Sequence, residues 1–293
     1  MKAAWHDGTT VSLPFEIWRD PEGLVAVLRE LGTADAVAIT MTAELSDAFR
    51  TKREGVAFVL DAAEEAFGDP RVLTTAGELI TVEDARARPW DVAAANWIAT
   101  ALAVADEHPD ALLIDVGSTT ADVIPIVAGR VAASGKNDLE RLLAGELVYT
   151  GVLRTNLAAI APRVPVRGGW CPVASELFAI SADVHLVLGH LEAYDCPTSD
   201  GRPATIEFAR ERIARLVCSD VDQLDNTEID AIAAFLHGEQ VRQIEDAARR
   251  QPDAPVIAAG SGAFMAREVA ARLGRAVADT AWSPASALAA RLC

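Results

Sequence analysis

The stretch LLIDVGSTTADVIPI, Leu112–Ile126, decides the fold that this chain is expected to adopt. An apolar strand delivers Asp115 to its end, a short polar turn follows, and Asp122 begins a second apolar strand. Gly117 is expected to adopt a backbone conformation that a Cβ would disfavour. The stretch therefore predicts a tight hairpin that carries two carboxylates close to its turn.

The turn itself is rich in groups that bind anions, namely Gly117, Ser118, Thr119 and Thr120. Successive backbone N–H groups in a tight turn converge on one point and form a concave anion site. Carboxylates beside a phosphate suit Mg²⁺, which prefers hard oxygen ligands and usually keeps several waters. We predict that the turn binds phosphate and that Asp115 binds Mg²⁺. An ordinary hairpin with a polar turn is the alternative.

A second glycine segment, PVIAAGSGAF, occupies Pro255–Phe264. Here an apolar strand runs through Gly260, Ser261 and Gly262 into a predicted helix. The glycines let the backbone approach a ligand, and a helix N-terminus adds partial positive charge. The segment predicts a second phosphate- or nucleotide-binding site, and a glycine turn needed only for packing is the alternative.

Basic residues cluster in MTAELSDAFRTKREG, Met41–Gly55, which is read as part of a long helix. Arg50, Lys52 and Arg53 could pair with phosphate or carboxylate, because guanidinium groups bind both in a bidentate way. Arg50 and Lys52 are the catalytic candidates, and a solvated helix face with glutamates as partners is the alternative. Three further arginines follow the hairpin, and position alone does not rank them: Arg141, Arg154 and Arg167.

Short strands alternate with helices on both sides of the hairpin, which predicts two α/β lobes, 1–107 and 108–293. Strands are expected at Lys2–Trp5, Thr10–Leu13, Ala36–Thr40, Arg71–Thr74, Glu78–Ile80, Ala111–Asp115, Asp122–Val127, Val131–Ala133, Pro255–Ala259 and Ala276–Asp279. Helices are expected at Pro21–Leu31, Ala43–Ala66, Trp90–Glu107, Asp138–Ala144, Ser175–Gly189, Ile206–Cys218, Asn226–Gln251, Ala263–Leu273 and from a Ser283 cap to Leu292.

Composition and charge exclude some partners and a membrane location. The chain has 293 residues and a formal net charge of -17, which repels nucleic acid and anionic membranes. It has no apolar run of about 20 residues and no targeting segment at its start, so we expect a cytoplasmic protein. The four cysteines lack CxxC spacing and are expected to be reduced. The five histidines form no HExxH or HxH set, so spacing predicts no His/Cys metal site.

Several long motifs resemble one known family, the hydantoinase/oxoprolinase-related proteins linked to tetrahydromethanopterin one-carbon metabolism, and its methanofuran-biosynthesis branch in particular. The resemblance covers nearly the whole chain, and its first and last motifs are specific to this group. The motifs are MTAELSDAFRTKREGVAFVLDAAEEAF, VAAANW (Val92–Trp97), LLIDVGSTTADVIPI, GELVYTGVLRTNL (Gly145–Leu157), SELFAISADVHLVLG (Ser175–Gly189) and YDCPTSDGRPAT (Tyr194–Thr205).

The resemblance implies the two-lobed actin/sugar-kinase/Hsp70 fold and a transferase reaction. A furanmethanol diphosphate would condense with the phenol of γ-glutamyltyramine and release pyrophosphate, so the partners would be a diphosphate ester and a phenolic amine. A homodimer is left open. Carried over by position, the residues holding phosphate would be Asp115, Gly117, Ser118, Thr119 and Thr120. Candidates for metal binding or general base are Asp115 and Asp122, and the nucleotide-side motif would be Gly260 and Gly262.

The start of the chain departs from the family pattern. Members open with a strand and an acidic first phosphate loop, D-x-G-G-x-N-T, directly before the sequence that stands here as Lys2-Ala3-Ala4. We therefore expect the N-terminal lobe to lack its first strand and first phosphate loop. A start assigned too late and a loss of function are the two explanations.

Three other functions stay open from the sequence. An ATP-dependent small-molecule kinase of the same fold would use the same site. A catalytically inactive binding relative would keep the fold alone. An amidohydrolase of the oxoprolinase kind fits less well, because the chain is much shorter and shows no His/Asp metal motif.

Overall fold

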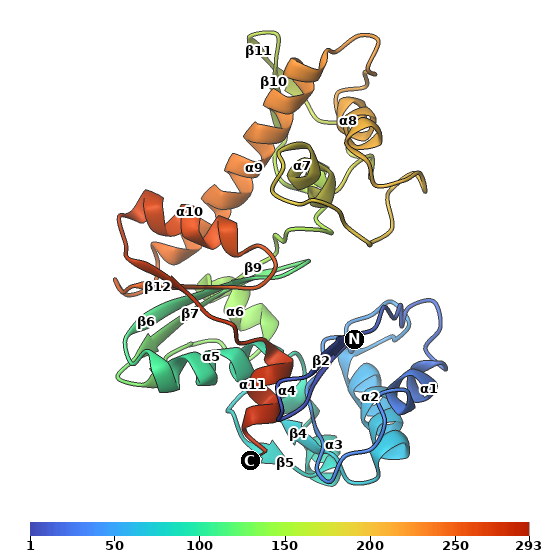
Figure 1. Cartoon of the computed structure of the whole chain (residues 1–293), viewed down its shortest axis with the longest axis vertical. Helices are drawn as coiled ribbons and strands as arrows, with labels where there is room; N and C mark the ends of the chain where they lie inside the picture. Colours follow the sequence, from blue (N-terminus) through green and yellow to red (C-terminus); the bar gives the residue numbers. More distant parts are fainter. Residues whose placement is uncertain (293) are drawn as a thin grey trace. The chain divides into compact units, whose positions relative to one another are not determined.

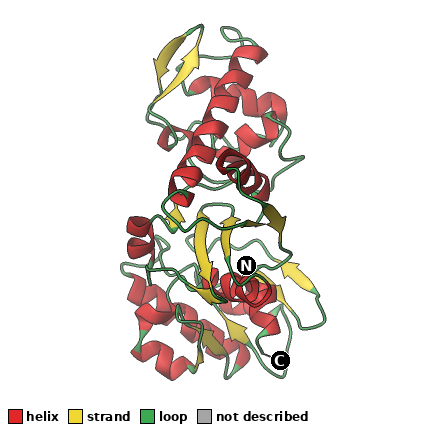
Figure 2. Cartoon of the chain, turned by 90° about the vertical axis from the view of Figure 1, so that its left-hand side faces the viewer, coloured by secondary structure: helices red, strands yellow, loops and turns green. Residues whose placement is uncertain are grey.

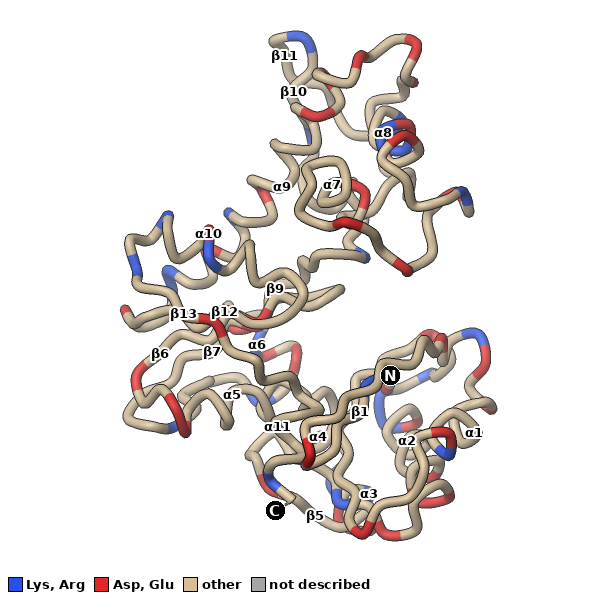
Figure 3. Tube along the Cα trace, in the orientation of Figure 1, with Lys and Arg blue, Asp and Glu red and all other residues tan. Residues whose placement is uncertain are grey.

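The computed structural model describes residues 1–292 and divides them into two compact units. Unit 1 comprises 1–111, 125–144 and the segment from Ala281 onward, and unit 2 comprises 112–124 and 145–280. The chain therefore passes between the units several times. The expected lobes 1–107 and 108–293 stay a prediction. Acidic and basic residues occur along the trace of both units (Figure 3).

Unit 1 begins with the hairpin that the Asp-Gly turn predicted. Strand β1 (Lys2–Ala4) pairs antiparallel with β2 (Thr10–Ser12). A separate sheet contains β3 (Ala38–Ile39) parallel to β4 (Arg71–Leu73), and β5 (Leu79–Ile80) antiparallel to β4. All five strands agree with the sequence expectations except for their ends.

The described helices of unit 1 are α1 (Leu24–Arg29), α2 (Lys52–Phe67), α3 (Val82–Ala87), α4 (Pro89–Val92), α5 (Asn96–Glu107), α6 (Asp138–Ala144) and α11 (Pro284–Ala290). All of them except α6, whose leucines are exposed, pack on strands of the unit or on one another (Figure 1). On α2, Val56 and Leu60 are buried against Val72 of β4. Helix α11 begins at the expected Ser283 cap.

Two long helices expected in this region are wrong in part. The helix expected from Ala43 begins only at Lys52, because extended Thr51 caps it and accepts a hydrogen bond from Glu54 N at 3.2 Å. The helix expected from Trp90 is interrupted, since Ala94 has a φ of 50°. Both breaks are backbone events that apolar spacing does not reveal.

The largest sheet has the strand order β13-β12-β6-β7-β8, with β9 paired to β7. Its strands are β6 (Ala111–Val116), β7 (Ala121–Val127), β8 (Arg130–Val131), β9 (Leu147–Val148), β12 (Val256–Ala259) and β13 (Val277–Asp279). Strand β12 runs parallel to both of its neighbours, β6 and β13. Strand β8 is antiparallel to β7, which confirms the expected return of the chain.

Helices α9 (Asn226–Ala248) and α10 (Ala263–Leu273) bury apolar side chains against the unit 2 part of this sheet. Helix α9 is unbroken. Its C-terminal half packs on the sheet, and the hairpin of β10 (Arg163–Val166) and β11 (Gly169–Pro172) lies at its N-terminal end (Figures 1 and 2). The sequence analysis missed this hairpin and the single turn at Leu157–Ala159.

A buried ion network holds α7 (Ser181–Val187) to α8 (Ile206–Arg215). Arg212 and Asp183 are fully buried, and the Arg212 Nη2 to Asp183 Oδ1 distance is 2.6 Å. Tyr194 also donates to Asp183 Oδ1 at 2.6 Å. Two of the long family-like motifs therefore meet in one polar core. Among residues 1–292, no helix has the length and apolar character needed to cross a bilayer.

Candidate functional site

The candidate site is built on the turn between β6 and β7. Gly117 N donates to Thr120 O at 2.8 Å, so these two residues close the hairpin. Counting back along antiparallel strands from this pair sets Asp115 opposite Asp122, with both carboxylates on the same face of the sheet. The strands are buried around these two half-buried residues, so the carboxylates mark the polar end of an apolar hairpin.

The loop 151–154 packs against the turn and donates hydrogen bonds to its carbonyl groups. Val152 N donates to Gly117 O at 3.0 Å, and Arg154 N donates to Ser118 O at 2.9 Å. An added Cβ on Gly151 would lie 2.4 Å from Thr119 N, so only glycine allows this close approach. The supporting loop thus engages the carbonyl groups of the turn.

The turn has backbone N–H groups that make no hydrogen bond within the described part of the chain, which is a feature of anion-binding turns. Within residues 1–292, the N–H groups of Ser118, Thr119 and Thr120 donate to no acceptor. The carbonyls of Gly117, Ser118 and Thr120 do accept hydrogen bonds, so the three N–H donors are the groups left for a ligand or for water. Phosphate binding by Gly117, Ser118, Thr119 and Thr120 stays a prediction.

Arg154 places a positive charge on the same turn. Its Nη2 donates to Thr119 Oγ1 at 2.6 Å and lies 3.4 Å from Ser118 Oγ. The side chain is exposed, so its remaining donors can reach an anion. The sequence could not rank this arginine above two others, because the contact spans 35 residues.

The other two arginines have different roles. Arg141 is buried in unit 1, where its guanidinium lies 4.2 Å from the centre of the Trp97 ring. Arg167 donates to Glu228 Oε1 at 3.0 Å beside the β10–β11 hairpin. The structure therefore brings only Arg154 of these three to the turn.

The glycine segment Pro255–Phe264 lies beside Asp115 of the β6–β7 hairpin. Strand β12 pairs with β6 so that Ala259 lies opposite Asp115. Gly260 follows with a φ of +81°, and an added Cβ would lie 2.3 Å from Asp115 Oδ1. Gly262 N donates to Val116 O at 2.9 Å, and α10 begins at the next residue. The positive end of this helix therefore lies beside the carboxyl end of β6.

The prediction that Gly117 adopts a backbone conformation disfavoured by a Cβ is wrong. Its φ is not in the left-handed region, and an added Cβ would meet only Thr120 O, at 3.5 Å. The position that requires glycine is Gly260, because its φ is +81° and there is no room for a Cβ. Ser261 is exposed between the two glycines of its segment, where a ligand can reach it.

The donor set fits a magnesium ion. Asp115 and Asp122 offer half-buried carboxylates on neighbouring strands, and the turn hydroxyls add neutral oxygens. Hard oxygen ligands with access to water are what Mg²⁺ prefers. Metal binding by Asp115 stays a prediction.

The basic candidates belong to unit 1. Lys52 Nζ lies 2.5 Å from Asp138 Oδ2, and Arg50 N donates to Glu54 Oε2 at 3.1 Å. Beside this pair Glu44 is only 2% exposed, and burial raises the pKa of its carboxyl, with Lys52 lowering it and Asp138 raising it. Sequence reasoning missed Glu44 as a buried acid. The catalytic roles of Arg50 and Lys52 stay predictions.

The fold has a counterpart among solved structures. The nucleotide-free structure of acetone carboxylase, from work on ATP-dependent acetone carboxylation, aligns with 98% of this chain and 50% of its own chain. The TM-score is 0.51 at 15% sequence identity, which concerns the fold alone. The protein has an α/β fold of the actin/sugar-kinase/Hsp70 type, as predicted.

Sequence comparison identifies the family. A family model for hydantoinase/oxoprolinase matches residues 35–291. The (4-{4-[2-(gamma-L-glutamylamino)ethyl]phenoxymethyl}furan-2-yl)methanamine synthase of Methanocaldococcus jannaschii is 38% identical over 237 residues, covering 79% of this chain and 72% of its own. The enzyme of the same name from Methanococcus vannielii is 44% identical over 124 residues, covering 42% and 55%. The chain belongs to the hydantoinase/oxoprolinase family.

Proposed function

We propose that this protein is a transferase that forms an aryl ether from a diphosphate ester and a phenol, in the synthesis of a methanofuran-type cofactor. The substrates would be a furanmethanol diphosphate and γ-glutamyltyramine. The proposal rests on the phosphate-type turn and on the names of the two methanogen relatives, which are synthases of a phenoxymethyl furan.

The proposed reaction is a substitution at the CH₂ group of the furan. The bond from this carbon to the diphosphate oxygen breaks, and a bond to the phenol oxygen forms. The phenol proton passes to a base, and pyrophosphate leaves with its negative charge. No oxidant or reductant is consumed, so the site has to stabilise the leaving group and activate the phenol.

The residues around the turn suit the departing pyrophosphate. The open N–H groups of Ser118–Thr120 and the guanidinium of Arg154 supply donors at one place. Magnesium on Asp115 would add charge neutralisation when bound. Asp122, opposite Asp115, is the candidate base within unit 2. The observation that carries the proposal is the combination of unused amides with an arginine held directly on the turn hydroxyls.

The test is release of pyrophosphate from both substrates with Mg²⁺. The chain should be assayed as given and with the family's strand and acidic phosphate loop added before Lys2. Release by either form, together with ether formation detected by mass spectrometry, is expected. No release by either form contradicts the proposal, and loss of release in Arg154→Ala ties the activity to the turn.

A kinase is the second candidate function, because the Gly260–Gly262 segment lies at a helix N-terminus beside Asp115. A nucleotide could use this segment for its phosphates. Calorimetry with Mg²⁺·ATP and Mg²⁺·pyrophosphate separates the two proposals. Preference for pyrophosphate supports the transferase, preference for ATP supports the kinase, and binding of neither supports an inactive relative.

A further inference from the structure

Two histidines meet at the C-terminus of α7. Gly189 follows the helix with a φ of +73°, and His190 N donates back to His185 O at 2.8 Å, as in a Schellman motif. This motif brings the residues three before and two after the helix cap onto one side. His185 Nδ1 and His190 Nδ1 are therefore 3.3 Å apart. His185 is fully buried, and His190 is exposed.

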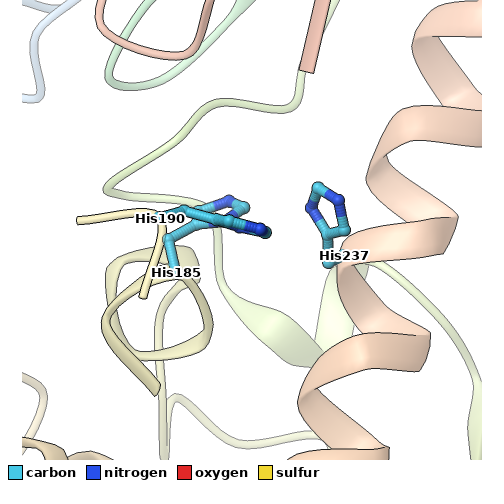
Figure 4. Close-up of side chains that lie close together, drawn as sticks. All are labelled: His185, His190 and His237. Atoms are coloured by element: carbon cyan, nitrogen blue, oxygen red, sulfur yellow. The ribbon is translucent and has the colours of Figure 1, made fainter. Parts of the chain in front are cut away.

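A third histidine faces this pair from α9. The ring centres of His190 and His237 are 4.6 Å apart, and Figure 4 shows a ring nitrogen of His237 turned toward the other two. One nitrogen from each of the three residues lies within 4.8 Å of the others. Phe264, two residues after Gly262, packs on all three rings and forms an apolar wall.

A carboxylate fixes the tautomer of His237. Glu268 Oε2 lies 2.8 Å from His237 Nε2, and Arg272 keeps Glu268 in place with an ion pair of 2.7 Å. Because Nε2–H donates to Glu268, the lone pair of His237 is on Nδ1. Among residues 1–292, His237 Nδ1 is a buried atom without a hydrogen-bond partner. A buried nitrogen lone pair without a partner is costly unless a ligand binds it.

From this geometry we propose a transition-metal site on His185, His190 and His237, with Glu268 positioning His237. Tetrahedral Zn²⁺ with bonds of about 2.0–2.1 Å separates its nitrogen ligands by about 3.3 Å, which matches the first pair. The third nitrogen lies within 4.8 Å and needs a small side-chain movement to reach the ion. Three nitrogen ligands leave the fourth position for water or a substrate oxygen.

This site is distinct from the proposed magnesium site. Nitrogen ligands favour Zn²⁺ and its transition-metal neighbours, whereas the carboxylates of the β6–β7 turn favour Mg²⁺. Helix α9 connects the two sites, because Gln240 Nε2, one turn after His237, donates to Gly151 O at 3.0 Å. Spacing along the chain could not predict the cluster, since His237 lies far from the other two in sequence.

The test uses the full chain without a polyhistidine tag. Metal is removed with a chelator, Zn²⁺ is returned, and bound zinc is measured by mass spectrometry after gel filtration. One zinc per chain is expected for the parent and for the control His6→Ala, whose ring is exposed at the start of the chain. His190→Ala, at an exposed ring, should lose the ion without unfolding, which circular dichroism checks.

Two further measurements distinguish a metal site from an aromatic cluster. Glu268→Gln should weaken Zn²⁺ binding about 10- to 100-fold in a chelator competition, because the carboxylate only orients His237. Co²⁺ should give the visible absorption of a tetrahedral nitrogen site in the parent and not in His190→Ala. No stoichiometric zinc in the parent, or equal binding in His190→Ala, overturns the proposal. These readouts do not depend on transferase activity.

Discussion

At the scale of single residues, the candidate site depends on two close backbone approaches. Gly260 lies against Asp115 and Gly151 lies against Thr119, each with no room for a Cβ. Both glycines join segments that are far apart in the sequence. They therefore fix the position of the β6–β7 turn more directly than Gly117, the glycine inside it.

Gly260→Ala should unfold the protein at a much lower urea concentration. The substitution combines strain at a φ of +81° with a clash against Asp115 and Val116. Gly274→Ala is the matched control, because its φ is +66° and nothing lies within 4 Å of the added Cβ. The control should lose about 1–2 kcal/mol and Gly260→Ala clearly more. Equal losses would mean that the close approach does not matter.

At the scale of elements, the hairpin, both glycine strands and α6 were predictable, because apolar runs there end at glycines or polar turns. The structure of the chain before Lys52 was not predictable, because its apolar residues have helical spacing although its backbone folds back on α2. An added Cβ on Gly55 would lie 2.3 Å from Glu44 O, so the two segments touch. Such a contact depends on tertiary structure, which periodicity does not contain.

Thr51→Ala tests where α2 begins, because the two possible starts predict opposite changes in the free energy of unfolding. As an N-cap, Thr51 accepts from Glu54 N, so its removal should lower the free energy of unfolding by about 1 kcal/mol. In a helix running from Ala43, the same change would stabilise the protein, because Ala is the better helix former. Thermal unfolding followed by circular dichroism gives the direction.

At the scale of the whole molecule, the resemblance and the turn predicted the fold class, and the structure confirms it. The sequence could not choose Arg154 among three arginines or bring three histidines together, because both depend on contacts across 35 residues or more. The polar core around Arg212 was also hidden, because its contacts join separate elements that lie up to 29 residues apart. Long-range polar contacts are the part of the site that local patterns miss.

The polar core also predicts acid sensitivity. Burial raises the pKa of Asp200, but hydrogen bonds from Arg202 and the charge of Arg212 outweigh it and hold the pKa at about 2, below the usual 3.8. A lowered folded-state pKa stabilises the protein above pH 3.8, and this contribution is lost as the pH falls toward 2. Asp200→Asn should therefore destabilise the protein at pH 6 and make much less difference near pH 2. A pH-independent difference in urea unfolding would contradict this cause.

The most direct test of the central claim is calorimetric titration with pyrophosphate and Mg²⁺. The account predicts binding to the parent chain that requires Mg²⁺. It also predicts that Arg154→Ala binds about 10- to 100-fold more weakly, because a charge-assisted contact of about 1.5–3 kcal/mol is lost. Arg167→Ala should bind as the parent does. No binding by the parent, or equal affinity in all three proteins, would contradict phosphate binding by the β6–β7 turn.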